Sequence, residues 1–288
     1  MADFIDLVLN PEIAFMRYAL AAGVLSSIAM GIIGTYVVAR RLTYLAGAIA
    51  HSTLGGIGAG LYLRDVSGWH SFHPMYGAVA AAIVSALVIG LVSLYAKERE
   101  DTVISAIWVV GMSLGIILLA KASAGGDAMS YLFGSILFIS PQDIQAIAIF
   151  DVFVVLTAIV FHNKLLAVCF DEEFARLRGI RSGCYYLLLL CITALAVVLL
   201  VRVVGIVMVI ALLFLPAAVA GNFAGRLWQM MVLAIIICSL VVTSGLAISY
   251  TNDLEAGPTI VLLAGTVYLL VAVAKSLRRA WFVGKASQ

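Results

Sequence analysis

Long apolar runs separated by short charged stretches are the feature that most constrains this chain. A helix needs about 20 consecutive, mostly apolar residues to cross the hydrocarbon core of a bilayer. Of the 288 residues, 64% are hydrophobic and 11% are charged, whereas a soluble domain is nearer half apolar and a quarter charged. The sequence therefore predicts an all-α, polytopic membrane protein, with a single transmembrane domain over residues 1–288.

The apolar runs predict nine crossings. Arg40 and Arg41 end the first span, and the charged run 97–101 ends the third. Arg202 and Gly205 together separate the sixth span from the seventh. A shorter apolar segment at 130–140 is not expected to cross, and counts of eight or ten crossings stay open. The spans are expected at 15–38, 44–63, 75–96, 102–120, 144–161, 185–201, 206–220, 230–250 and 258–274.

The distribution of Lys and Arg predicts the orientation, because cytoplasmic loops carry an excess of these residues. With the C-terminal tail inside, 13 of the 17 Lys and Arg residues fall on the cytoplasmic side and 4 on the other. The N-terminus is then outside. The longest polar island, residues 162–183, is cytoplasmic, and the loop after the second span faces the opposite side.

No motif for ATP hydrolysis or covalent catalysis occurs in the sequence. It has no phosphate-binding loop, no His-Glu-x-x-His helix and no nucleophile elbow. The cysteines show no Cys-x-x-Cys pairing; they are Cys169, Cys184, Cys191 and Cys238. We therefore expect a protein that is not itself an enzyme, that holds no permanently bound cofactor and that has no nucleic-acid partner.

The cytoplasmic island contains a short predicted amphipathic helix at 170–180. The acidic residues at 171–173 favour its N-terminus, and Arg176 and Arg178 lie nearer its C-terminus, as the helix dipole prefers. Gly179 is a natural C-cap. The residues alone leave two interpretations open, a solvated loop helix and a docking element for a partner protein.

The pattern Glu173-x-Ala175-x-x-x-Gly179 resembles the EAA-x-x-x-G signature of ABC-transporter permeases. Other stretches, in the same order over nearly the whole chain, resemble the zinc/manganese/iron metal-ion permeases of bacterial ABC importers, the ABC-3 type. These stretches are 34–41 with the following His51 segment, 130–137, 170–179, 202–205, 211–218 and 257–262.

This resemblance implies a multi-pass permease subunit of the bacterial inner (plasma) membrane that works as a homodimer. A periplasmic binding protein would deliver a divalent metal cation to it. A separate ATPase subunit would power transport by binding the cytoplasmic helix at Glu173, Ala175 and Gly179. We expect Zn²⁺ as the transported cation, with Mn²⁺ and Fe²⁺ as alternatives.

His51 is the candidate metal ligand. It lies within a predicted span, where ionisable residues are functional-site candidates by default, and imidazole suits Zn²⁺, or Mn²⁺ and Fe²⁺ with oxygen partners. A packing histidine bonded to a neighbouring carbonyl is the alternative. In the resembled family an aspartate precedes this histidine by four residues, where this chain has Gly47. Without that carboxylate, we expect a histidine-biased Zn²⁺ site.

His70 and His73 lie three residues apart in the loop after the second span, with Asp65 nearby. One interpretation is a loop contact or docking against a periplasmic partner. The other is a transient metal-capture site at the entrance of the path.

A secondary carrier driven by an ion gradient is the alternative function. Such a carrier would need intramembrane carboxylates as proton or Na⁺ relays. We expect no Asp or Glu well inside a span, which argues against this alternative. A membrane enzyme that uses His51 with a metal is a third class, and it lacks a second catalytic group.

Overall fold

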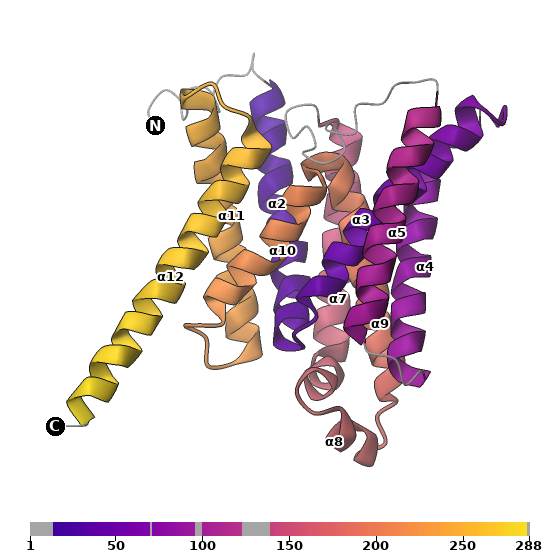
Figure 1. Cartoon of the computed structure of the whole chain (residues 1–288). Coiled ribbons are helices and arrows are strands. Elements are labelled where there is room, and N and C mark those ends of the chain that lie inside the picture. Colours follow the sequence, from indigo (N-terminus) through magenta and orange to yellow (C-terminus); the bar gives the residue numbers. More distant parts are fainter. Residues whose placement is uncertain (1–13, 70, 96–99, 123–138, 287–288) are drawn as a thin grey trace.

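The computed structural model describes residues 14–69, 71–95, 100–122 and 139–286 (Figure 1). Over these residues the chain forms ten α-helices and no strand, which confirms the all-α prediction. The helices are α2 (Ala14–Ala39), α3 (Thr43–Asp65), α4 (Pro74–Tyr95), α5 (Glu100–Lys121), α7 (Pro141–Phe170), α8 (Glu172–Leu177), α9 (Ser182–Val204), α10 (Ile206–Ala220), α11 (Leu227–Thr251) and α12 (Ala256–Ala286).

The nine longer helices of the described chain follow the nine predicted spans in order. Seven of them are long and apolar enough to cross a membrane on their own: α2, α4, α5, α7, α9, α11 and α12. The other two are α3, which is less apolar, and α10, which has 15 residues. The break predicted at Gly205 is confirmed, because this residue has φ 87° between α9 and α10. Of the predicted short segment 130–140, residues 130–138 lie outside the described residues.

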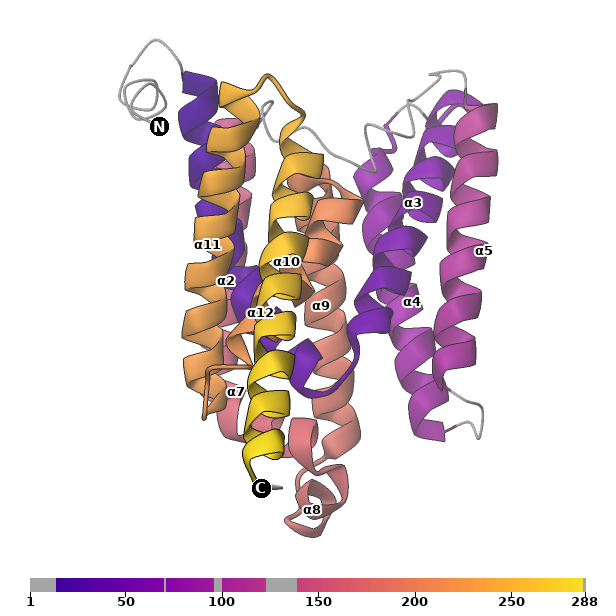
Figure 2. The same cartoon turned by 60° about the vertical axis from the view of Figure 1, so that its left-hand side comes forward.

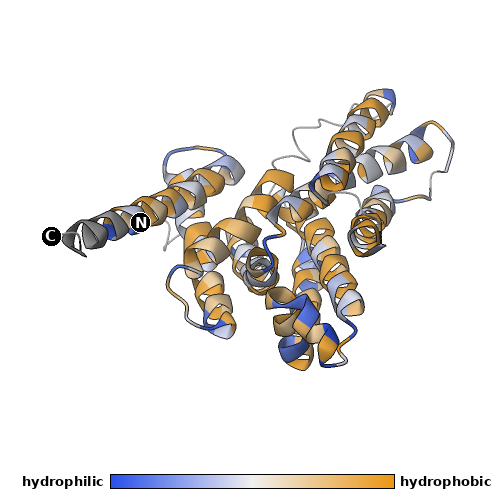
Figure 3. Cartoon of the chain, turned by 60° about the horizontal axis from the view of Figure 1, so that its bottom comes forward, coloured by the Kyte–Doolittle hydropathy of each residue, from blue (hydrophilic) through white to orange (hydrophobic). Residues whose placement is uncertain are grey.

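The ends of the bundle differ in what they carry. The short helix α8, the corner between α2 and α3 and the C-terminal end of α12 lie at one end, and the start of α2 lies at the other (Figures 1 and 2). Figure 3 shows apolar residues along the helices and hydrophilic residues mainly at helix ends and in connections. The end with α8 is the predicted cytoplasmic end.

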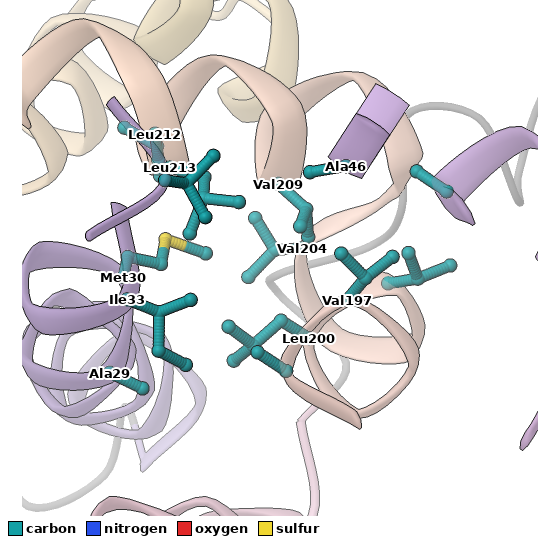
Figure 4. Packing of buried hydrophobic residues seen from close by; sticks show 14 of the residues in the cluster. Ala29, Met30, Ile33, Ala46, Val197, Leu200, Val204, Val209, Leu212 and Leu213 are labelled. Carbon is teal, nitrogen blue, oxygen red and sulfur yellow. The ribbon is translucent and has the colours of Figure 1, made fainter. Parts of the chain in front are cut away.

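The apolar core lies where α2, α9 and α10 meet. Met30 and Ile33 of α2 lie close to Leu200 of α9 and to Leu213 of α10 (Figure 4), and all four side chains are buried. Dense packing of this kind holds membrane helices together by van der Waals contact, since lipid tails are as apolar as the side chains. Helix α3 packs against α9 and α10 of this core.

Glycines let α3 approach its neighbours α4 and α5 closely (Figure 2). A Cβ added to Gly56 would overlap the carbonyl oxygen of Gly77 in α4, and a Cβ added to Gly55 would lie 2.7 Å from the carbonyl oxygen of Gly111 in α5. Real Cβ atoms essentially never come this close to another heavy atom. The backbone of α3 is therefore in direct contact with the backbones of both neighbouring helices.

A tight corner joins α2 to α3. The N–H of Leu42 donates to the carbonyl of Val37 at 2.9 Å, and the N–H of Arg41 donates to the carbonyl of Val38 at 3.0 Å. This pair of hydrogen bonds is a Schellman motif, and Arg41 takes the left-handed conformation that glycine usually adopts there, with φ 62°. Helix α3 begins at Thr43, two residues after Arg41. The end of α2 therefore sets where α3 starts.

We expect Gly56→Ala to lower the thermal unfolding midpoint of the detergent-solubilised protein. The added methyl group pushes α3 away from the α4 backbone, and overpacking of this kind costs about 1–3 kcal/mol. Gly265→Ala in α12 is the matched control, because a Cβ there meets nothing within 4 Å and alanine favours a helix by about 1 kcal/mol over glycine. Equal midpoints for the two variants would contradict the close α3–α4 contact.

Candidate functional site

His51 lies on the face of α3 that packs against α5. Gly47 and Gly55, one turn before and one turn after it, share this face. A Cβ on Gly47 would lie 2.9 Å from Cζ3 of Trp108, and Gly55 meets the carbonyl of Gly111, both in α5. The position of the candidate ligand therefore depends on how α3 and α5 pack.

The imidazole of His51 is stacked on the indole of Trp108. The two ring centroids are 4.7 Å apart and the ring planes differ by 19°. Nδ1 of His51 is buried and has no hydrogen-bond partner among the described residues. Within the described part of the chain, Nδ1 therefore does not form the carbonyl hydrogen bond expected of a packing histidine.

Trp108 occupies the space that a side chain four residues before His51 would enter. A Cβ on Gly47 would lie 2.9, 3.2 and 3.7 Å from three atoms of the indole ring. A side chain at position 47 and the indole at position 108 therefore compete for one volume. No group of three or more His, Cys, Asp or Glu side chains that could hold a metal ion occurs in the described part of the chain, so His51 supplies a single imidazole.

Of the two loop histidines, only His73 lies within the described residues. His70 lies outside the described residues. His73 is exposed, its Nδ1 accepts a hydrogen bond from the N–H of Met75 at 3.3 Å, and its ring meets Tyr76 edge-on. Asp65 is bound to its neighbour Arg64, with Nε and Oδ1 2.7 Å apart. This carboxylate is therefore already neutralised.

The cytoplasmic helix predicted at 170–180 is present as α8, and both of its ends are capped. The side chain of Asp171 accepts a hydrogen bond from the N–H of Phe174 at 2.9 Å. At the other end Gly179 has φ 75°, and the N–H of Ile180 donates to the carbonyl of Ala175 at 3.0 Å. The short helix is thus held by its own local hydrogen bonds.

The residues of the EAA-like pattern have different surroundings. Ala175 is completely buried, on the side of α8 that faces the membrane helices, and Glu173 and Gly179 are exposed. Large apolar side chains are exposed on the same segment, with 47% of Phe174 and 87% of Leu177 accessible. Exposed apolar side chains beyond the membrane-spanning part are typical of a protein-docking surface.

A charged cluster ties α8 to the membrane helices, and sequence reasoning did not identify it. Nη2 of Arg40 lies 2.7 Å from Oε2 of Glu172, and Nη2 of Arg176 lies 2.5 Å from Oε1 of the same carboxylate. Burial acts to raise the pKa of Glu172, but the hydrogen bonds from both arginines outweigh burial and hold this pKa below its usual value. The i, i+4 spacing of Glu172 and Arg176 was a local signal for part of this cluster.

The expectation that no carboxylate lies well inside a span is wrong. Asp151 lies in the middle of α7, is 4% exposed, and its Oδ1 accepts a hydrogen bond from the N–H of Ala29 in α2 at 3.2 Å. Its Oδ2 and the hydroxyl of Ser26, three residues before Ala29, are buried without a partner in the described structure. The acid was overlooked because the surrounding run is otherwise apolar, although the sequence itself contains it.

Comparisons with known proteins agree with the fold and with the ordered motifs. The chain is 39% identical, over 84% of its length and 83% of the relative, to a probable metal transport system membrane protein of Chlamydia pneumoniae. It is 31% identical, over 89% of its length and 86% of the relative, to the manganese transport system membrane protein MntC of Halalkalibacterium halodurans.

Among solved structures, PsaBC from Streptococcus pneumoniae in complex with Fab matches with a TM-score of 0.81 and 28% identity, over 94% of both chains. The family model described as the ABC 3 transport family matches residues 12–275. The predicted family and the predicted multi-pass location in the bacterial inner membrane are therefore confirmed. The chain belongs to the ABC 3 transport family and is the permease, not the catalytic subunit, of a metal ABC transporter.

Proposed function

We propose that this permease imports a divalent transition-metal cation, with a separate ATPase subunit bound at α8 and a periplasmic binding protein at the opposite end. The observation that carries the proposal is α8 itself, a capped and tethered helix that leaves apolar side chains exposed at the predicted cytoplasmic end. The whole chain acts as one transmembrane domain.

The surface of α8 suits a groove in a partner protein. Phe170, Phe174 and Leu177 supply exposed apolar area. Arg178 lies over the ring of Phe174, with its guanidinium carbon 4.7 Å from the ring centroid, and the exposed Glu173 adds a charge of opposite sign. Buried apolar anchors surrounded by polar groups are typical of stable interfaces. Glu173, Ala175 and Gly179 of the EAA-like pattern belong to this docking segment.

We propose a homodimer whose path follows the shared axis, with His51 of each copy as a ligand. The described part of one chain holds no group of three or more potential metal ligands, and each copy of the chain supplies one imidazole from His51. A second copy supplies a second imidazole, and a site with few ligands binds weakly enough to release its cation, as transport requires. His70 and His73 are candidate entrance contacts.

Two observations favour different cations. His51 stacks on an aromatic ring, and position 47 is a glycine where the resembled family has a carboxylate. Imidazole binds Zn²⁺ more strongly than Mn²⁺. The relatives MntC of Halalkalibacterium halodurans and ScaB of Streptococcus parasanguinis are named for manganese. We favour Zn²⁺ from the chemistry of the site, with Mn²⁺ as the first alternative and Fe²⁺ as the second.

Asp151 gives the ion-gradient carrier a specific observation in its favour, since a buried intramembrane acid is what a proton or Na⁺ relay requires. Its position argues for the ABC mechanism instead. Asp151 lies between α7 and α2 and binds a backbone N–H of α2, whereas His51 lies between α3 and α5. The acid therefore joins α7 to α2, away from the candidate metal ligand.

We expect Leu177→Asp to reduce co-purification of the ATPase subunit by about ten-fold, since an apolar interface anchor contributes about 2 kcal/mol and a buried charge opposes docking. Leu254→Asp is the matched control, because Leu254 is also exposed but lies in the loop between α11 and α12, at the opposite end. Co-purification that is equally strong with both variants would contradict docking at α8.

We expect His51→Ala to reduce uptake of radiolabelled Zn²⁺ by more than about ten-fold, because even outer ligand partners contribute about that much to metal affinity. Unlabelled Zn²⁺ should compete with the label in the wild-type protein at lower concentrations than Mn²⁺ does. Undiminished uptake by a folded His51→Ala variant would remove His51 from the path. Stronger competition by Mn²⁺ would assign manganese as the cargo.

We expect Asp151→Asn to change ATP-dependent uptake by less than about two-fold, as for substitutions that keep their contacts. The amide oxygen of asparagine still accepts the hydrogen bond from Ala29, while the charge and the exchangeable proton of the carboxyl group are lost. The measurement compares proteoliposomes energised by ATP with proteoliposomes energised by an imposed pH or Na⁺ gradient. Gradient-driven uptake that is lost in Asp151→Asn would support the secondary carrier.

A further inference from the structure

Arg40 brings four helices together at the predicted cytoplasmic end. Its backbone ends α2, and its Nη2 forms an ion pair of 2.7 Å with Glu172 at the start of α8. Its Nη1 donates to the carbonyl of Val168 in the last turn of α7. The guanidinium carbon lies 4.7 Å from the centroid of the Tyr186 ring in α9. One side chain thus contacts α7, α8 and α9 at once.

These contacts match the chemistry of a guanidinium group. A planar fork can donate to a carboxylate and a carbonyl while its face lies on an aromatic ring, whereas the compact ammonium of lysine cannot do all three. The Arg40 side chain is 17% exposed and Tyr186 is 1% exposed. The cluster is therefore shielded enough for its hydrogen bonds to hold a fixed geometry.

Glu172 extends the connection along α8. Nε of Arg176 donates to the hydroxyl of Ser182 at 2.9 Å, and this hydroxyl donates to Oε1 of Glu172 at 3.2 Å. Arg176 itself donates to the same carboxylate oxygen. Glu172 is the first residue of α8, and Ser182 is the first residue of α9. These hydrogen bonds hold α8 firmly against the start of α9.

The corner after Arg40 connects the cluster directly to α3. Arg41 and Leu42 complete the Schellman motif, and Leu42 is 9% exposed. Thr43 then starts α3, and His51 lies about 12 Å farther along the helix at 1.5 Å per residue. The link between Arg40 and α3 contains no glycine and is held by the two hydrogen bonds of the Schellman motif. We therefore expect a displacement of Arg40 to displace the start of the helix that carries the candidate metal ligand.

We propose that Arg40 is the positioning residue that joins α8 to α3, so that a displacement which the ATPase imposes on α8 reaches the helix of the metal site. The direction of this coupling rests on the proposed function. Its mechanical part, that α8 and the start of α3 move as one body, does not depend on what the protein transports.

The mechanical part is tested with spin labels on the full chain in lipid nanodiscs, without the ATPase. Labels at Tyr44→Cys and Leu177→Cys report the distance between α3 and α8, since these two side chains are 69% and 87% exposed. The exposed Cys184 is replaced by serine in all samples. We expect a narrow distance distribution in the otherwise wild-type protein and a distribution broadened about two-fold or more in Arg40→Gln and Arg40→Lys.

Arg41→Gln is the matched control. Arg41 is the neighbouring arginine and is exposed, and glutamine at this left-handed position keeps the same backbone requirement. Its distance distribution should equal that of the wild type. If Arg40→Gln does not fold, Glu172→Gln breaks the same ion pair from the other side and should broaden the distribution similarly. A narrow distribution in folded Arg40→Gln or Glu172→Gln would overturn the proposal, and a narrow one in Arg40→Lys would overturn the requirement for a guanidinium.

The functional part is tested in proteoliposomes that contain the permease and its ATPase, with native Tyr44 and Leu177. We expect the number of Zn²⁺ ions transported per ATP hydrolysed to fall about ten-fold in Arg40→Gln, a loss typical of a coupling free energy between two sites. It should change by less than about two-fold in Arg41→Gln, as for an exposed side chain. An unchanged ratio in Arg40→Gln would overturn the coupling role. Absence of ATP-dependent metal uptake in the wild type would contradict the proposed function instead, and the spin-label result would still stand.

Discussion

Close contact between helix backbones is the constraint on which the rest of this structure depends. Inside a bilayer the hydrophobic effect does not drive helices together, so packing must do it. Glycines in α3, α4 and α5 allow that packing by removing the side chains that would keep the backbones apart. Helix α3 is held in this way on two sides, and its face toward α5 carries His51.

The same close approach determines the chemistry near His51. Because α5 lies against α3, the indole of Trp108 fills the space beside Gly47 and stacks on the imidazole. Gly47, where this chain departs from the pattern of the resembled family, therefore contacts the ring that stacks on His51. The aromatic ring occupies the volume that a carboxylate would need, and Nδ1 of the histidine has no hydrogen-bond partner among the described residues.

Polar groups elsewhere in the bundle serve to connect helices. One oxygen of Asp151 accepts a hydrogen bond from a backbone N–H of α2, which lowers the cost of burying this acid inside an apolar span. At the predicted cytoplasmic end the cluster of Arg40, Glu172 and Arg176 is partly exposed to solvent. Charged groups there satisfy one another without the full desolvation penalty of a deeply buried pair. The helices are thus joined by a charged cluster at one end, and by backbone packing and the Asp151 contact in the middle.

Features that depend on residues near one another in the chain could be predicted from local patterns. The apolar runs predicted the order of the helices, the glycine at 205 predicted the break between α9 and α10, and the acidic start and Gly179 predicted both ends of α8. The ordered motifs identified the family before any geometry was known. These features depend on residues that lie within a few turns of one another in the chain.

Contacts between residues far apart in the chain depend on how whole helices pack, and they could not be predicted from the sequence. Arg40 and Glu172 are 132 positions apart, and Ala29 and Asp151 are 122 apart. Trp108 beside Gly47 is a contact between helices that no spacing within one helix reveals. Such pairs arise from the way whole helices pack, and a periodic pattern along one helix specifies which face is apolar but not which neighbour that face will meet.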